Sequence, residues 1–131
     1  MADNTQRYRD GRGWEEAAGY SRAVRRFGHI AVSGTTATAP DGSALHPGDS
    51  YGQTHAAIEQ GLAGVRALGG RREDVTRTRL YLAPAADWRE AARAHAEIFG
   101  QVAPANTTLL VAGLIGEDFL VEVELEAELP A

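Results

Sequence analysis

A regular row of carboxylates lies near the end of the chain. Over residues 121–129 every second residue is apolar, and the four residues between them are Glu122, Glu124, Glu126 and Glu128. Side chains alternate between the two faces of a β-strand, so this spacing predicts a strand with four carboxylates on one face. A carboxylate can orient a water molecule or accept its proton, which is general-base chemistry.

The row also has structural explanations. Its glutamates would repel one another at a spacing of about 7 Å, which is tolerable on a fully solvated face and costly on a covered one. Arg77 and Arg79 alternate in the same way within residues 75–82 (VTRTRLYL). The row is therefore a solvated face, a set of Glu–Arg pairs across strands or subunits, or one wall of a site.

A second candidate for chemistry is the dipeptide Ser33-Gly34, which follows the apolar run of residues 30–32. Backbone N–H groups exposed at such a strand end can hold a carbonyl or carboxylate oxygen. A turn would favour the same dipeptide for backbone reasons alone. Ser33 does not lie in a Gly-x-Ser-x-Gly sequence, so a serine nucleophile at a strained elbow is not indicated.

The residue types that the chain lacks exclude much covalent and metal chemistry. It has no Cys and no Lys, and all 13 basic residues are Arg. A disulfide, a thiolate nucleophile, a Cys-based metal site, a Schiff base and a phosphate-loop lysine are therefore excluded. The four histidines form no His-x-x-x-His pair, and no glycine fingerprint joins a strand to a helix, so we expect neither a metal nor another cofactor.

The composition is that of one ordinary globular domain. The 131 residues are 44% hydrophobic and 24% charged, with a net charge of −5. An acidic chain is a poor partner for nucleic acid, and no apolar run approaches the roughly 18 residues of a membrane span. The charged N-terminus lacks a secretory apolar region, so we expect a cytoplasmic protein. At this size, a site in a cleft shared between subunits is favoured over a deep private cavity.

Seven elements would position the candidate residues. Alternation, apolar spacing, and Gly or Pro boundaries predict strands over 20–24, 29–33, 75–82, 107–112 and 120–129, and helices over 49–68 and 88–99. Asp49 or Ser50 would cap the first helix and Asp87 the second, and Gly28 would supply the positive φ of a hairpin turn.

The order β-β-α-β-α-β-β predicts an α+β two-layer sandwich, with both helices on one face of a mixed sheet. Residues 1–18 are polar and show no period, so we expect them to form a peripheral N-terminal arm. Residues 19–131 would then form a single domain.

Several segments, taken in order, resemble the RidA/YjgF family. They are GYSRA (19–23), IAVSG (30–34), Gln53 with the helix that ends in LGG (68–70), DVTRTRLY (74–81), PANTT (104–108) and LVEVE (120–124). The resemblance implies a chorismate-mutase-like homotrimer with ligand clefts at its three subunit interfaces. It also implies a cofactor-independent activity, because the best-known members hydrolyse reactive imines and enamines to ketones and ammonia.

The resemblance also implies roles for individual residues. Tyr20 corresponds to an aromatic wall of the cleft, and Ser33 and Gly34 correspond to groups that bind an oxygen atom. Glu122 corresponds to the carboxylate that positions or deprotonates the attacking water. Thr107 lies where the family has a small hydroxyl residue.

One position departs from the family pattern. The deaminating members carry an arginine that grips the substrate carboxylate, and this chain has Asn106 there. An amide lacks the charge, so about 1.5–3 kcal/mol of charge-assisted hydrogen bonding is missing. Standard imino acids are therefore disfavoured substrates.

Several alternatives stay open from the sequence. The chain is either a hydrolase of a neutral or differently anchored carbonyl, imine or enamine compound, or a non-catalytic trimer that binds a metabolite or a partner. Arg22, Arg25, Arg26 or an arginine of a neighbouring subunit could replace the missing cation. A shift of two residues would put Glu124 in place of Glu122.

Overall fold

The computed structural model describes residues 4–131 and contains one mixed sheet of six strands in the order β1-β2-β3-β6-β4-β5. The strands are β1 (Thr5–Tyr8), β2 (Ala23–Arg26), β3 (His29–Thr36), β4 (Val75–Leu82), β5 (Ala105–Leu110) and β6 (Val121–Glu128). β4 and β5 are parallel, and the other neighbours are antiparallel. The chain thus has the predicted α+β class, with its last strand in the middle of the sheet.

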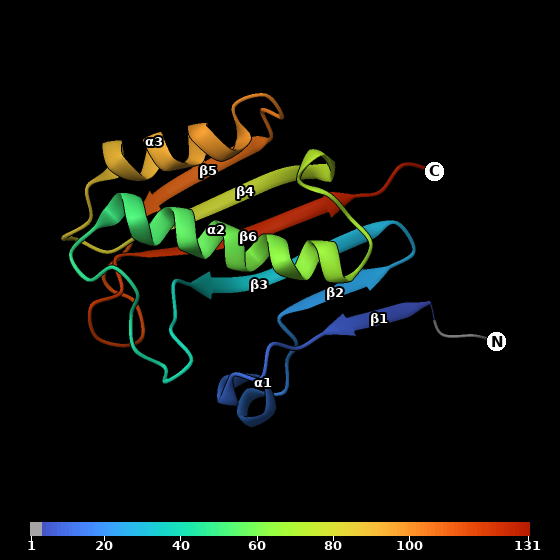
Figure 1. Cartoon of the computed structure of the whole chain (residues 1–131), viewed down its shortest axis with the longest axis horizontal. Coiled ribbons are helices and arrows are strands. Elements are labelled where there is room, and N and C mark those ends of the chain that lie inside the picture. Colours follow the sequence, from blue (N-terminus) through green and yellow to red (C-terminus); the bar gives the residue numbers. More distant parts are fainter. Residues whose placement is uncertain (1–3) are drawn as a thin grey trace.

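Two long helices, α2 (Ser50–Ala67) and α3 (Trp88–Phe99), lie on one face of this sheet (Figure 1). Both predicted caps are confirmed. The Asp49 carboxylate accepts a hydrogen bond from the N–H of Gly52, and the Asp87 carboxylate accepts from the first turn of α3. Both helices therefore have their N-termini where the sequence predicts them.

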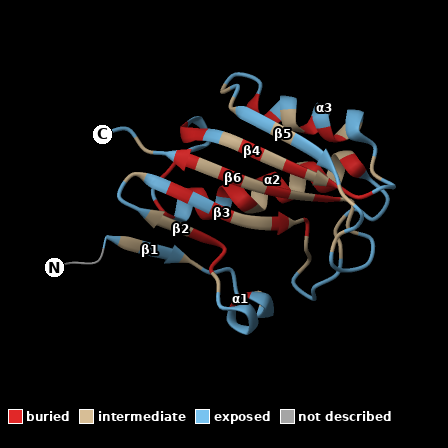
Figure 2. Cartoon of the chain, turned by 180° about the vertical axis from the view of Figure 1, so that it is seen from behind, coloured by how far each residue is buried: buried red, intermediate tan, exposed pale blue. Residues whose placement is uncertain are grey.

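The core fills the space between the helices and the sheet. Its fully buried members come from α2, α3 and the inner face of the strands, and include Ile58, Leu62, Leu82, Phe99 and Val123. Figure 2 shows the other face of the sheet, which no helix of residues 4–131 covers. Alternation along β6 therefore divides apolar core residues from the row of glutamates, as the sequence predicts.

The N-terminal arm contains two elements that the sequence does not predict. β1 pairs antiparallel with β2, for example Gln6 with Arg25, and a six-residue helix α1 (Gly13–Ala18) follows it. Elements this short carry no detectable period and depend on tertiary contacts. Residues 1–3 lie outside the described residues, and the division of the chain after residue 18 stays a prediction.

The hairpin also differs from its prediction. β2 begins at Ala23 rather than at Tyr20 and continues through Arg26. The left-handed residue of the turn is Phe27, with φ of 52°, and not Gly28. β5 begins at Ala105, two residues before the predicted start, because its pairing with β4 extends the strand.

A short 3-10 turn, η1 (Arg72–Asp74), joins α2 to β4. None of the helices in residues 4–131 is both long and apolar enough to cross a bilayer.

Candidate functional site

Most of the glutamate row is paired, as its structural explanation requires. Arg79 lies 2.7 Å from Glu126 and 3.9 Å from Glu124, and the Tyr81 hydroxyl donates a hydrogen bond to Glu124. His29 contacts Glu128 at 2.8 Å. Within residues 4–131, Glu122 is the member of the row that has no hydrogen bond or ion pair.

Glu122 lies against a bulge in β3. Pairing with β6 runs from Val32 opposite Leu125 directly to Thr35 opposite Val123, so Ser33 and Gly34 together occupy one step of the ladder. A Cβ on Gly34 would overlap Oε2 of Glu122. The bulge therefore places a glycine where the Glu122 carboxylate needs space. Bulges often change the direction of side chains beside functional sites in this way.

The surroundings of Glu122 raise its pKa above the ordinary value. Burial is the largest cause and the neighbouring charge of Glu124 adds to it, whereas Arg22 acts in the opposite direction. A half-buried carboxylate with a raised pKa exchanges protons closer to neutral pH than a solvated one.

Arg22 is a cation that lies beside this site. Its side chain is 3% exposed, and its guanidinium donates to the carbonyl oxygen of Gly34 at 2.6 Å. It lies 5.7 Å from the centre of the Tyr20 ring and forms an ion pair with Asp10 at 3.2 Å. Arg22 thus binds the carbonyl oxygen of Gly34, and the Glu122 carboxylate packs against the same residue.

The N-terminal arm holds Arg22 in this position. Asp10 is shared between Arg22 and Arg12, which lies 2.9 Å from it. Burial tends to raise the pKa of Asp10, but the two arginines outweigh it and keep that pKa below the ordinary value. The buried Glu15 accepts a hydrogen bond from the backbone N–H of Arg22 at 2.8 Å.

The polar groups of Ser33 are engaged with the backbone. Its hydroxyl donates to the carbonyl of Ser21 at 2.6 Å, and its N–H donates to the carbonyl of Arg22 at 2.9 Å. These bonds stabilise the bulge. Among the predicted residues, Ser33, Gly34 and Glu122 are therefore brought together, and Tyr20 lies beside the Arg22 side chain that binds Gly34.

Asn106 and Thr107 do not join that group. Asn106 pairs with Thr78 and donates to its hydroxyl at 3.0 Å on the helix-covered face of the sheet. Thr107 points to the opposite face, where Arg77 contacts its hydroxyl at 3.5 Å. It lies two strands from β6, or roughly 10 Å. In one chain, Asn106 and Glu122 therefore face opposite sides of the sheet.

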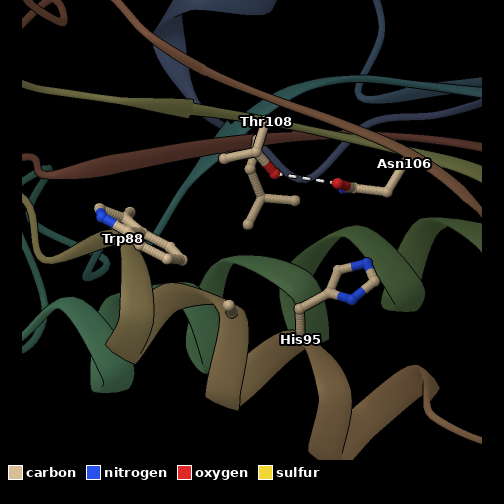
Figure 3. Close-up of a pocket in the computed structure, with 6 residues that line it drawn as sticks. Trp88, His95, Asn106 and Thr108 are labelled. Carbon is tan, nitrogen blue, oxygen red and sulfur yellow. Dashed lines mark hydrogen bonds between the residues drawn. The ribbon is translucent and has the colours of Figure 1, made fainter.

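Asn106 instead lines a pocket of about 260 Å³ between α3 and β5. Figure 3 shows Trp88 and His95 of α3 pointing toward Asn106 and Thr108 of β5. The lining residues are Leu80, Trp88, Ala92, His95, Asn106 and Thr108.

The helical spacing of Trp88, Ala92 and His95 with the core residues Ile98 and Phe99 predicts one apolar stripe on α3, buried along its whole length. The structure corrects this: Trp88 is 52% exposed, Ala92 is exposed and His95 is half-buried. The core covers the last turn of this stripe but not its first residue, and the polar histidine in the Trp-x₃-Ala-x₂-His spacing is the sequence signal for a pocket wall.

The structure also bears on the arginines considered as replacements for the missing cation. Arg25 donates to the carbonyl of Leu68, and Arg26 donates to the hydroxyl of Thr5, both at the end of the sheet away from Glu122. Arg22 alone of the three lies beside Glu122. In the described part of the chain, no three His, Cys, Asp or Glu side chains gather as a metal site would require.

This chain is similar to known proteins in both sequence and fold. A family model described as "Endoribonuclease L-PSP" matches residues 13–129. The chain belongs to the RidA/YjgF family. Among solved structures, Rv2704 of Mycobacterium tuberculosis, described as a member of the YjgF/YER057c/UK114 family, is 33% identical with a TM-score of 0.85. The similarity covers 95% of this chain and 99% of that one.

Two relatives are similar to this chain in sequence over most of its length. An uncharacterised protein of Streptomyces coelicolor is 38% identical over 126 residues, which are 96% of this chain and 93% of that protein. A RutC family protein of Pyrococcus horikoshii is 29% identical over 105 residues, which are 80% of this chain and 82% of that protein. The resemblance seen in the sequence motifs is thus confirmed.

Proposed function

We propose that this RidA/YjgF protein forms a homotrimer that binds a small carbonyl, imine or enamine metabolite in clefts between subunits and hydrolyses it. The observation that carries the proposal is Glu122: a half-buried carboxylate with a raised pKa, unpaired beside paired neighbours, and resting against Gly34. Such a group is available to hold a water molecule.

The proposed reaction needs only water and the substrate. The Glu122 carboxylate accepts a proton from water as the water oxygen bonds to the imine carbon, and the imine nitrogen takes up a proton. The carbinolamine then collapses: its hydroxyl proton passes by way of the Glu122 carboxylate to the amino nitrogen, the C–N bond breaks, and ammonia leaves as the C=O bond forms. An enamine enters the same sequence once its carbon has been protonated to give the imine.

The positions of the two halves support an oligomeric site. The Glu122 side of the sheet and the pocket beside Asn106 cannot face one ligand within a chain, because the sheet lies between them. β5 is an exposed edge strand next to that pocket. A neighbouring subunit docked along this edge would bring its Glu122 group to the pocket, which supports a shared cleft.

Ammonia release from a panel of imines tests the proposal. We expect Glu122→Gln to lower the rate by about 10²–10⁴-fold, the usual effect of losing a general base. Glu128→Gln, on the same strand but exposed and paired with His29, should keep the wild-type rate. Equal rates in wild type and Glu122→Gln would contradict the proposal, and loss of activity in Glu124→Gln alone would reassign the base.

A non-catalytic trimer that binds a metabolite or a partner is the second candidate. The amide of Asn106 is bonded within its own chain, and the residues lining its pocket include no arginine. A bound compound recovered chemically unchanged, with no ammonia formed from related imines, would favour this function.

The charge of this chain disfavours the endoribonuclease activity that the family's description names. The net charge is −5, and the uncovered sheet face presents glutamates to any approaching phosphate. RNA binding needs a basic surface instead.

A further inference from the structure

We propose that the pocket between α3 and β5 receives an uncharged, largely apolar group, so that the ligands of this site are neutral carbonyl or imine compounds and not carboxylates. The inference rests on the proposed function only in assigning this pocket to the reactive cleft. It is carried by the hydrogen bonding, the charge and the walls of the pocket.

The polar side chains of the pocket are bonded to one another. Thr108 Oγ1 donates to Asn106 Oδ1 at 3.0 Å, and Asn106 Nδ2 donates to Thr78 Oγ1 at 3.0 Å. The fully buried Thr78 hydroxyl also lies 2.8 Å from His95 Nε2. Asn106 is left with one amide hydrogen for a ligand, whereas a carboxylate needs several donors or a positive charge.

No cation of the described residues lines the pocket at neutral pH. Burial lowers the pKa of His95, which keeps its imidazole uncharged. Arg77 and Arg79 of the adjacent strand contact Thr107 and Glu126 on the opposite face of the sheet. A carboxylate moved into this pocket would lose water without gaining a partner of opposite charge.

The walls favour an apolar occupant of modest size. Leu80, Ala92 and the ring of Trp88 supply carbon surface, and Arg89 stacks on that ring with its Cζ 4.4 Å from the ring centre. The volume of about 260 Å³ lies just below the ~300–1,000 Å³ of drug-sized sites. A small planar or branched neutral group fits this description.

Matched neutral and anionic probes test the inference. Benzamide and benzoate, and isobutyramide and isobutyrate, differ in charge at nearly constant shape. In the full-length Trp14→Phe variant, Trp88 is the sole tryptophan, so its fluorescence reports occupancy of the pocket. We expect each amide to bind at least about tenfold more tightly than its acid, and Asn106→Arg to reverse that order.

Two substitutions on α3 test the location. Ala92→Leu fills the pocket and should weaken amide binding about tenfold or more. Ala96→Leu adds the same side chain at an exposed position of the same helix outside the pocket and should leave binding unchanged. Ligand-detected NMR on the intact oligomer provides a second readout that does not depend on Trp88.

Several outcomes would overturn the inference. They are benzoate binding as tight as benzamide binding, amide binding unaffected by Ala92→Leu, or no binding of any probe at millimolar concentration. Benzoate binding that disappears in Arg89→Met would assign an anion site to Arg89 instead. Amide-selective binding without ammonia release would reject hydrolysis and keep this inference, whereas rapid turnover of imino acids would do the opposite.

Discussion

Gly34 and Glu122 pack against each other in the proposed site. Gly34 lies in the bulge, and its carbonyl accepts a hydrogen bond from Arg22. The Glu122 carboxylate occupies the space that a Cβ of residue 34 would fill. Any side chain at position 34 would compete with that carboxylate for the same space. Because the competing atom is the end of a flexible side chain, the glutamate and not the strand would give way.

We expect Gly34→Ala to displace Glu122 while the chain stays folded. The unfolding free energy should change by less than about 1 kcal/mol, whereas imine hydrolysis should fall at least about tenfold. Thermal unfolding and ammonia release measure the two effects. Gly113→Ala is the matched control, because a Cβ there has no neighbour within 4 Å. Wild-type activity in Gly34→Ala would place the base elsewhere.

The neighbours of Glu122 should tune its protonation in opposite directions. Burial and Glu124 raise the pKa of Glu122, and Arg22 lowers it. Glu124→Gln should therefore lower that pKa and move the acidic limb of the rate profile to lower pH, whereas Arg22→Met should raise the pKa and move the limb to higher pH. Carboxyl ¹³C NMR, assigned with Glu122→Gln, follows the group directly. Shifts of the same sign in both variants would contradict the prediction.

At the scale of elements, α3 serves two purposes with one apolar stripe. Ile98 and Phe99 are buried in the core, whereas Trp88 and His95 reach beyond it to the pocket. The same helical spacing therefore predicts burial correctly at one end of the stripe and wrongly at the other. Trp88 is the first residue of α3 and Ile98 and Phe99 are its last, so the burial of these large side chains changes along the helix.

Two truncations on α3 should separate these purposes. Ile98→Ala removes buried volume and should cost about 2–5 kcal/mol of unfolding free energy, while Trp88→Ala should cost less than about 1 kcal/mol. Denaturant titration measures both. Probe binding should show the reverse order, with Trp88→Ala the weaker binder. Equal losses of stability would mean that Trp88 belongs to the core.

The N-terminal arm is tied to the domain through Asp10, and this tie should depend on pH. The arginines hold the folded-state pKa of Asp10 below its unfolded value, so its stabilisation is present above the unfolded pKa and is lost as pH falls through the folded pKa. Asp10→Asn should cost about 1 kcal/mol at pH 7 and less at pH 3, which lies below the unfolded pKa. Unfolding at both pH values measures this difference, with the exposed Glu117→Gln as the control.

The sequence alone predicts the elements with strong periods. Alternation predicts β6 and its glutamates, and Asp49 and Asp87 mark where the long helices begin. It does not predict β1, since four polar residues at a sheet edge have no characteristic pattern. Nor does it predict that Asn106 and Glu122 lie on opposite faces, because that depends on the register of β5 against β4.

At the scale of the whole molecule, this opposition determines where a site can form. One chain supplies the Glu122 group on the uncovered face and the Asn106 pocket on the helix-covered face. If both act on one ligand, the two halves belong to different subunits. Each cleft would then contain residues that no single chain can bring together.

Mixing subunits tests this arrangement. Glu122→Gln and the pocket-filling Ala92→Trp should each be inactive alone. Co-expressed at equal levels, they should regain about one quarter of the wild-type activity, because random pairing makes about one cleft in four with both halves intact. Native mass spectrometry would verify the mixed oligomers. Their complete inactivity would show that each chain carries its whole site.

The exposed edge strand β5 should affect the aggregation and the thermal stability of the protein in solution. Leu109 and Leu110 are 50% and 69% exposed on a strand whose outer side has no neighbouring strand within residues 4–131. The unpaired backbone N–H and C=O groups of such an edge can pair with strands of other chains. A single folded chain is therefore prone to aggregate until a specific neighbour covers this edge. We expect the melting temperature to rise with protein concentration, as mass action requires of chains that stabilise one another by assembly.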